Sequence, residues 1–266
     1  KHKPEMAVAN RLNMDVFVPA LVFAAMAGKS FDLVAYAPLA LAGFLVLAAC
    51  GLLAWPIAKL CGVQAKTLAP PMMFNNSGNI GLPLAVLAWG ENALPAAVIL
   101  FMVENTLHFS FGAKLLDPKT RILMLWRIPV VFAAIAGLAV AVLKIPVWQP
   151  LVIAIKMLGD VSVPLLLFSL GVRMTDVSFG EWKLSVGSAL LRPLAGMAIA
   201  WAVIQLLGLE GRDAAMLLVF GALPPAVLNF LFAERYKQEP QRVASIVLVG
   251  NLAALIFLPL ALALVL

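Results

Sequence analysis

Two apolar stretches of this chain each contain a Pro-Pro pair followed by an asparagine, and together they could bind a carboxylate. The first stretch runs from Pro70–Pro71 to Asn75, and the second from Pro224–Pro225 to Asn229. Proline removes a backbone donor and clashes with the preceding turn, so we expect each helix to break at its proline pair. A broken helix exposes N–H groups with partial positive charge, which attract anions.

The residues around the two breaks form the candidate substrate site. We predict that it is made by Asn75, Asn76, Ser77, Gly78, Asn79, Pro225 and Asn229. Neutral amide and hydroxyl donors suit an anion that must bind and then leave, because a buried cation would hold the anion more firmly. An alternative interpretation is that these side chains only satisfy the backbone groups that the prolines free.

Ionisable residues inside apolar segments are a second set of candidates. Glu104 and His108 are spaced i, i+4 with Asn105 beside them, and Lys156 and Asp160 have the same spacing. Such residues in a membrane are functional by default, and histidine titrates near neutrality, so either group could carry a coupled proton. The alternative is that each pair is neutralised internally and orients its helices.

The remaining candidate residues do not indicate an enzyme. Arg192, which precedes a proline in an apolar segment, could face an anionic substrate, but we favour the interpretation that it caps the cytoplasmic end of a helix or extends to the membrane surface. A hydrolase built on Glu104 and His108 is disfavoured, because the chain lacks G-x-S-x-G and H-E-x-x-H motifs and has only 2 histidines. We therefore predict no enzyme, no catalytic residue, no metal site and no cofactor.

The composition shows which elements must position these residues. The 266 residues are 64% hydrophobic and only 12% charged, which is typical of a protein that crosses the membrane several times. About 20 apolar residues span a bilayer. We place spans near 11–28, 34–58, 63–89, 93–115, 122–143, 149–172, 183–208, 213–236 and 242–265. The net charge of +6 lies in loops without a basic run, so we predict no nucleic-acid partner.

Assigning the loops to alternate sides separates the basic residues. One side holds Lys1, Lys3, Arg11, Lys59, Lys66, Lys114, Lys119, Arg121, Arg127, Arg173, Lys183, Arg235, Lys237 and Arg242. The other side holds only Lys29, Lys144 and Arg212. Since basic loops stay cytoplasmic, we expect residue 1 in the cytoplasm and the C-terminus outside.

An internal repeat indicates two halves of opposite orientation. The segment that begins at Asp15 reads D-V-F-V-P-A-L-V-F, and the segment that begins at Asp160 reads D-V-S-V-P-L-L-L-F. The Pro-Pro-x-x-x-Asn pair follows in the same order, which predicts an inverted repeat. We divide the chain into 1–116, with four helices, and 117–266, with five. We expect a complete fold of ten helices in a 5+5 arrangement, of which this chain lacks the first.

Three segments resemble the auxin efflux carrier family, within the wider bile acid, arsenite and riboflavin transporter group. Residues 76–84 read N-S-G-N-I-G-L-P-L and are similar to the family signature N-x-G-x-x-G-L-P-L. Residues 222–236 carry A-L-P near their start and F-A-E-R-Y near their end, like the penultimate helix of the family. Residues 164–171 read P-L-L-L-F-S-L-G and resemble its P-L-x-L-x-x-x-G segment.

The resemblance implies a fold and a function. It implies an all-α polytopic membrane protein of the bile acid symporter and sodium–proton antiporter type, whose fourth and ninth helices are broken and cross near the midplane. It also implies scaffold and transport bundles that interleave across both repeats, and a mono- or dicarboxylate carried by alternating access. The expected location is a bacterial inner membrane.

Several questions stay open at this point. A sodium-coupled symporter of the same fold and a non-transporting receptor or subunit remain alternatives. Proton or sodium coupling, assembly as a homodimer, the identity of the organic anion and the direction of transport are undetermined by the sequence.

Overall fold

A computed structural model describes residues 6–27, 33–119, 129–162, 164–165, 168, 172 and 182–266. Parts of the expected spans 122–143 and 149–172 lie outside these residues, as does most of the segment 164–171. The same holds for Lys1, Lys3, Lys29, Arg121, Arg127 and Arg173. Within the described ranges the chain is helical, and its one pairing of extended segments is an isolated bridge between Asn75 and Pro225.

The helices follow the expected spans. Five described helices are long and apolar enough to cross a bilayer: Val8–Met26, Val34–Leu60, Glu91–Leu116, Trp182–Leu207 and Pro240–Ala263. Shorter apolar helices cover Ser77–Trp89 and Pro129–Val142. The chain is therefore an all-α polytopic membrane protein, as the sequence predicted. It divides into two compact units, each assembled from separate stretches of sequence.

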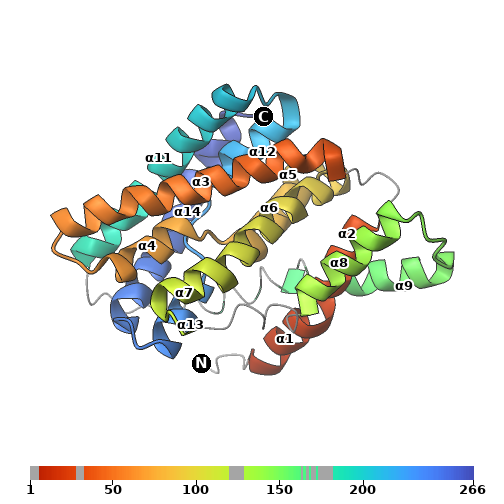
Figure 1. Cartoon of the computed structure of the whole chain (residues 1–266), viewed down its shortest axis with the longest axis horizontal. Coiled ribbons are helices and arrows are strands. Elements are labelled where there is room, and N and C mark those ends of the chain that lie inside the picture. The colour runs from red at the N-terminus through yellow and green to blue at the C-terminus, as the bar shows by residue number, and fades with distance from the viewer. Residues whose placement is uncertain are drawn as a thin grey trace. The chain divides into compact units, whose positions relative to one another are not determined.

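Unit 1 comprises residues 1–37, 78–102 and 121–175. It contains α1 (Ala7–Leu12), η1 (Asn13–Phe17), α2 (Val18–Met26), α5 (Leu82–Trp89), η3 (Glu91–Ala93), α8 (Pro129–Val142) and α9 (Gln149–Asp160). Helix α2 packs against both α8 and α9. The approach to α9 is close, because a Cβ on Gly159 would lie 2.7 Å from the backbone of Leu21. These helices are labelled in Figure 1.

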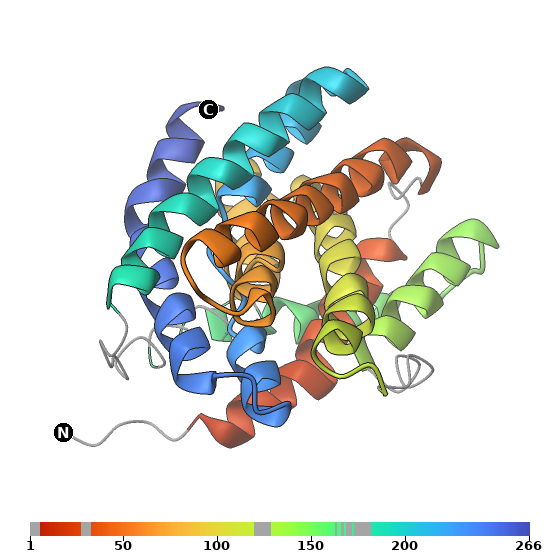
Figure 2. The same ribbon diagram turned by 60° about the vertical axis from the view of Figure 1, so that its left-hand side comes forward.

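Unit 2 comprises residues 38–77, 103–120 and 176–266. It contains most of α3 (Leu33–Leu60), then α4 (Ala65–Met73), η4 (His108–Gly112), α7 (Ala113–Leu116), α11 (Trp182–Leu207), α12 (Gly211–Ala222), α13 (Leu228–Arg235) and α14 (Pro240–Ala263). Helix α11 packs on α12 and α14, and Figure 2 shows α11 beside α14. Three described elements cross the boundary between the units: the start of α3, α6 (Leu94–Leu107) and η2 (Ser77–Gly81).

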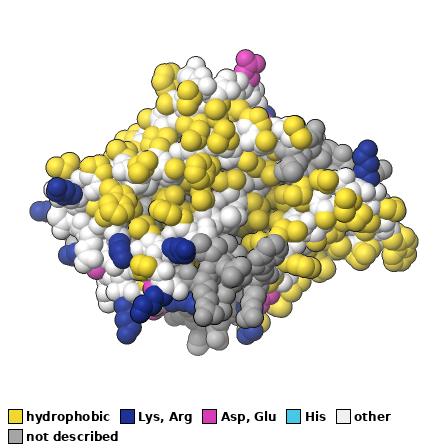
Figure 3. Space-filling model, in the orientation of Figure 1, with side chains coloured by type: hydrophobic (Ala, Val, Ile, Leu, Met, Phe, Trp, Pro, Cys, Tyr) yellow, Lys and Arg dark blue, Asp and Glu magenta, His cyan; other side chains and the backbone are white. Residues whose placement is uncertain are grey.

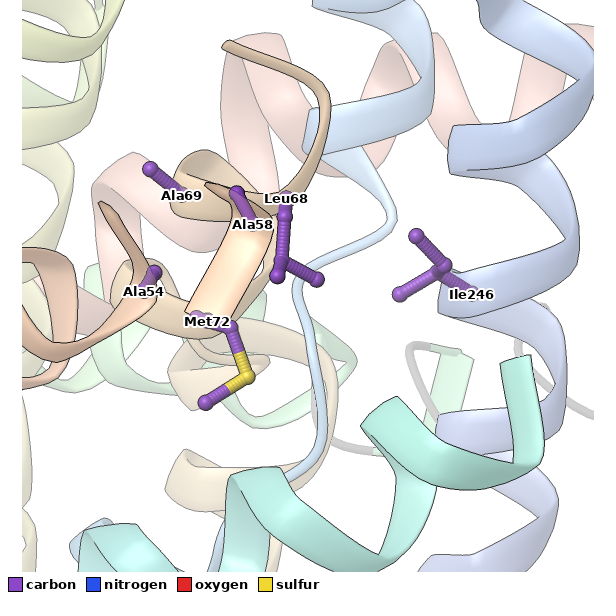
Figure 4. Close-up of a cluster of buried hydrophobic side chains, with 6 residues drawn as sticks. All are labelled: Ala54, Ala58, Leu68, Ala69, Met72 and Ile246. Atoms are coloured by element: carbon purple, nitrogen blue, oxygen red, sulfur yellow. The ribbon is translucent and has the colours of Figure 1, made fainter. Parts of the chain in front are cut away.

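The core of unit 2 joins helices that are distant in sequence. Ala54 and Ala58 of α3 pack with Leu68 and Met72 of α4, and Ile246 of α14 completes the cluster with Ala69 (Figure 4). Alanine on α3 leaves room for the leucine and methionine of α4 to pack against it. This packing fixes α4 just before the first break.

The position of the first break differs from the sequence prediction. Pro70 and Pro71 lie inside α4, which continues to Met73; the break comes at Phe74, whose backbone is extended with φ −93° and ψ 114°. The expectation of a break at this proline pair is wrong, because proline disturbs the turn before it and leaves later residues free to stay helical. The Phe74 N–H still donates to Pro70 O at 2.8 Å. In the second stretch, by contrast, α12 ends at Ala222 and Pro224–Pro225 form the break itself.

The surface of unit 2 is typical of a membrane protein. In the view of Figure 3, the side chains over α3 are mostly hydrophobic, and lysine and arginine side chains gather toward the lower left. Exposed apolar residues of this unit include Leu52, Trp55, Trp201 and Leu255. Scattered residues of this kind face lipid in a membrane-spanning bundle.

Candidate functional site

The candidate site is the point in unit 2 where the two broken helices are joined by backbone hydrogen bonds. The Asn76 N–H donates to Pro224 O at 2.7 Å, and the Ala226 N–H donates to Phe74 O at 3.0 Å. Asn75 and Pro225 therefore face each other as the non-hydrogen-bonded pair of an antiparallel bridge. Proline fits this position because the pair needs no N–H from it. We call these two segments, 74–76 and 223–227, the crossing.

Asparagine side chains cap carbonyl groups that the breaks set free. The last carbonyls of a helix have no partner within it. Asn75 Nδ2 donates to Phe220 O of α12 at 2.8 Å, and Asn229 Nδ2 donates to Phe74 O and Ala226 O, each at 3.0 Å. Each break therefore supplies an amide that holds a carbonyl of the other stretch.

Asn251 of α14 contacts both segments of the crossing, and sequence reasoning missed it. Its Nδ2 donates to Pro225 O at 3.0 Å and to Val247 O at 2.7 Å, while its Oδ1 accepts from Asn76 Nδ2 at 2.9 Å. The only signal in the sequence is an amide in the middle of the apolar α14, where a polar residue needs a partner. Asn251 links α14 to both breaks.

Two amide oxygens at the crossing are buried without a partner among the described residues. They are Asn75 Oδ1 and Asn229 Oδ1, on side chains that are almost completely buried. The carbonyl partners fix these orientations, because a carbonyl only accepts and must therefore face the amide nitrogen. The amide nitrogens that we predicted as donors to a substrate thus donate to backbone carbonyls of the protein. The groups without a partner among the described residues are the amide oxygens, which are acceptors.

A buried carboxylate lies beside the first break. Glu104 Oε2 accepts from Ser77 Oγ and from Asn105 Nδ2, each at 3.1 Å, and Glu104 Oε1 lies 3.0 Å from His108 Nδ1. All four side chains are buried. The structure therefore brings together the predicted group Glu104, Asn105 and His108, and adds Ser77 to it.

Aromatic contacts connect this carboxylate cluster to the crossing. The His108 ring stacks on Phe74 with centroids 4.1 Å apart and planes 8° apart, and Phe232 meets His108 edge-on at 4.9 Å. Gly112 makes this stack possible, because a Cβ there would lie 2.7 Å from Phe74 Cε2. His108 Nε2 is buried and has no partner among the described residues.

Arg192 also belongs to the centre of unit 2. Its side chain is 0% exposed, and Nη1 donates to Gly221 O at 2.8 Å. The interpretation of Arg192 as a cap at the helix end or a residue that extends to the membrane surface is wrong, because the side chain is buried and donates to the carbonyl of Gly221 near the end of α12. Its Nε and Nη2 have no partner in the described part of the chain.

The remaining predicted residues lie in unit 1. Gly78 packs there against Phe101, and Asn79 follows it in η2. Lys156 Nζ contacts Asp160 Oδ2 at 3.0 Å, as the spacing predicted, and also reaches Glu91 Oε1 at 3.2 Å. The structure thus separates the predicted residues into a crossing group in unit 2 and a Lys156 group in unit 1.

The fold and these features define a class: an integral membrane protein with two interrupted helices that are hydrogen-bonded at their breaks. The chain belongs to the membrane transport protein family, whose model matches residues 4–262. Members of this family are transporters and not enzymes. The resemblance to auxin efflux carriers found in the sequence is confirmed.

Curated relatives agree with this family. The chain is 25% identical over 178 residues to auxin efflux carrier component 6 of Arabidopsis thaliana, which covers 64% of the chain and 29% of the relative. It is 30% identical over 146 residues to auxin efflux carrier component 3a of Oryza sativa subsp. japonica, covering 50% of the chain and 24% of the relative. Each alignment thus covers less than a third of the relative's length.

Proposed function

We propose that this protein is a secondary carrier of small organic anions that works by alternating access and binds its substrate at the crossing. The observation that carries the proposal is the bonded crossing itself. Irregular backbone at membrane depth is tolerated where protein buries it or where it lines a cavity, and paired broken helices are typical of substrate sites.

The donors that would meet a carboxylate are on Arg192. Its Nε and the adjacent N–H of Nη2 form one edge of the planar guanidinium, and both are buried and unpaired among the described residues. That edge matches the two oxygens of a carboxylate and binds it through two parallel hydrogen bonds. A buried guanidinium without such partners is unfavourable, which supports an anion as the missing one.

The predicted site residues then take two roles. Asn75, Asn76 and Asn229 hold the crossing through their amide nitrogens. Ser77, with Gly78 and Asn79 after it, begins the helical segment that follows the first break, where backbone N–H groups favour an anion. Pro225 keeps the second segment extended.

The division of the chain supports alternating access. Each unit is compact and draws on both repeats, 1–116 and 117–266. Two rigid bodies built from interleaved repeats are what a rocking mechanism requires. We assign unit 2, which contains the crossing, as the moving body. We assign the side that carries most of the lysine and arginine residues as the cytoplasmic side.

Uptake into proteoliposomes tests the proposal. Purified protein would be assayed with radiolabelled malonate, malate and phenylacetate, and we expect saturable uptake of at least one. Arg192→Gln should raise KM at least about tenfold, since a charge-assisted pair is lost. Arg212→Gln, which changes an exposed arginine in the first turn of α12, is the control. No saturable uptake of any carboxylate, or an unchanged KM in Arg192→Gln, would overturn it.

Sodium coupling is a second candidate with its own observation. The unpaired Asn75 Oδ1 and Asn229 Oδ1 are acceptors, and oxygens at broken helices coordinate sodium in transporters. Replacing sodium by N-methylglucamine during uptake decides the question. Unchanged uptake eliminates sodium coupling, whereas loss of uptake establishes it.

A further inference from the structure

Unit 1 contains a cavity of about 440 Å³ that is separate from the crossing residues. Its volume lies within the range of small-molecule sites. Most of its wall is apolar and comes from α2, α5 and α6: Leu21, Ala24, Ala25, Val86, Leu94 and Pro95. Such a wall suits the hydrocarbon body of a small amphipathic ligand.

One end of the cavity is charged. Lys156, Glu91 and Asp160 line it, and the ammonium of Lys156 contacts Glu91 Oε1 at 3.2 Å and the two oxygens of Asp160 at 3.3 and 3.0 Å. An ammonium has three N–H donors. The three oxygens in contact therefore match its three donors, so a further carboxylate can bind Nζ only by displacing one of them. The three side chains are about half exposed or more, so a solute can reach them.

The two acidic partners of Lys156 differ in how firmly they are held. Asp160 lies one turn away on the same helix, α9, and contacts Nζ through both oxygens. Glu91 comes from the turn after Gly90, is 69% exposed, and makes a single contact. An exposed ion pair of this kind contributes at most about 1 kcal/mol. A competing carboxylate could therefore replace Glu91 at little cost.

We propose that this cavity is a second binding site for the same class of substrate, a small carboxylate with an apolar body. The carboxylate takes the place of Glu91 at Lys156, Glu91 moves into water, and the apolar body lies against α2, α5 and α6. The inference rests on the proposed function for its substrate class. The cavity site uses residues of unit 1, whereas the proposed site at the crossing uses residues of unit 2.

The net charge of Lys156, Glu91 and Asp160 determines how an anion can bind in this cavity. One lysine and two carboxylates sum to a negative charge, which by itself favours a cation. Only exchange of Glu91 for the ligand lets an anion bind without adding a third carboxylate to Lys156. Removing the charge of Glu91 should consequently strengthen anion binding, whereas it should weaken binding of a cation.

Calorimetry on the purified chain in nanodiscs tests this with three probes of one shape: phenylacetate, neutral phenylacetamide and phenethylammonium. We expect phenylacetate to bind best. Glu91→Gln should lower its Kd about threefold, and Lys156→Met should raise it at least about tenfold. Lys156→Arg should restore binding. Glu210→Gln and Lys144→Met, which change exposed residues outside the cavity, are charge-matched controls that should leave Kd unchanged.

The outcomes separate the two proposals. Phenethylammonium binding that Glu91→Gln abolishes would overturn the inference, and so would a phenylacetate Kd that neither Glu91→Gln nor Lys156→Met changes. If either of these results is obtained and saturable uptake still depends on Arg192, only the cavity site is overturned, and the proposed function is supported. Phenylacetate binding that depends on Lys156, in a protein that transports no carboxylate, supports the cavity site and overturns the proposed function.

Discussion

Asn76 Nδ2 and Asn251 Oδ1 are joined by a buried hydrogen bond of 2.9 Å. It links the first break to the middle of α14. Because Asn251 also holds Pro225 O, one amide connects three segments that are far apart in the sequence. The crossing is therefore supported by a helix that contains no break of its own.

The first prediction concerns this support. Asn251→Leu removes the donor to Pro225 O and the acceptor for Asn76, and leaves both groups buried. We expect a loss of about 2–4 kcal/mol of stability. Thermal unfolding of purified protein in detergent measures it, with exposed Gln241→Ala at the start of α14 as control. Equal melting temperatures for Asn251→Leu and the control would show that Asn251 does not stabilise the crossing.

The second prediction concerns the close approach of α11 and α12. A Cβ on Gly196 would lie 2.0 Å from Gly221 O, so Gly196→Ala must push the helices apart and disturb the Arg192 contact. We expect loss of folded protein or a clearly lower melting temperature. Gly187→Ala on the same helix is the matched control, since its Cβ would meet nothing within 4 Å. Gly187→Ala should leave the melting temperature unchanged or raise it, because alanine favours a helix more than glycine does. Similar behaviour of the two variants would contradict the packing.

The third prediction separates holding the crossing from binding the anion. Asn229→Ala removes the side-chain donor to Phe74 O and should lower stability by about 1–2 kcal/mol. It should change KM for a transported carboxylate less than Arg192→Gln does. Unfolding and uptake measured on both variants test this. A larger effect on KM from Asn229→Ala than from Arg192→Gln would show that Asn229 contacts the substrate directly.

The fourth prediction concerns Glu104 and His108. Their contact at 3.0 Å is buried, so the two residues should be coupled in a double-mutant cycle of Glu104→Gln and His108→Phe. Phenylalanine keeps an aromatic ring against Phe74 and removes both ring nitrogens, including the Nδ1 that contacts Glu104. We expect a coupling of about 1–3 kcal/mol in unfolding free energy. Additive effects of the two substitutions on the unfolding free energy would show that Glu104 and His108 are not energetically coupled.

Much of the fold follows from local properties of the sequence. The length and apolar character of each segment located the helices, because a bilayer needs a fixed number of apolar residues. The i, i+4 spacing predicted the contacts of Glu104 with His108 and of Lys156 with Asp160, because that spacing places residues on one helix face. The family signature around Gly78 and Pro83 identified the class.

What the sequence did not predict depends on contacts between distant segments. The break after Pro70–Pro71 is displaced to Phe74, where bonds to residues 224 and 226 stabilise an extended chain. The role of Asn251 and the burial of Arg192 follow from carbonyls that only the fold brings near them. The contact of Glu91 with Lys156 joins residues that no local spacing relates. Whether the two repeats of 1–116 and 117–266 are equivalent stays a prediction.

The bridge between Asn75 and Pro225 has a consequence for how such proteins diversify. Its two hydrogen bonds run from main chain to main chain, and almost every amino acid provides the same N–H and C=O groups. Replacements along these segments can therefore alter the lining of the crossing while its backbone geometry persists. If the crossing binds the substrate as proposed, substitutions of these side chains can change which substrate binds while the backbone bridge is retained.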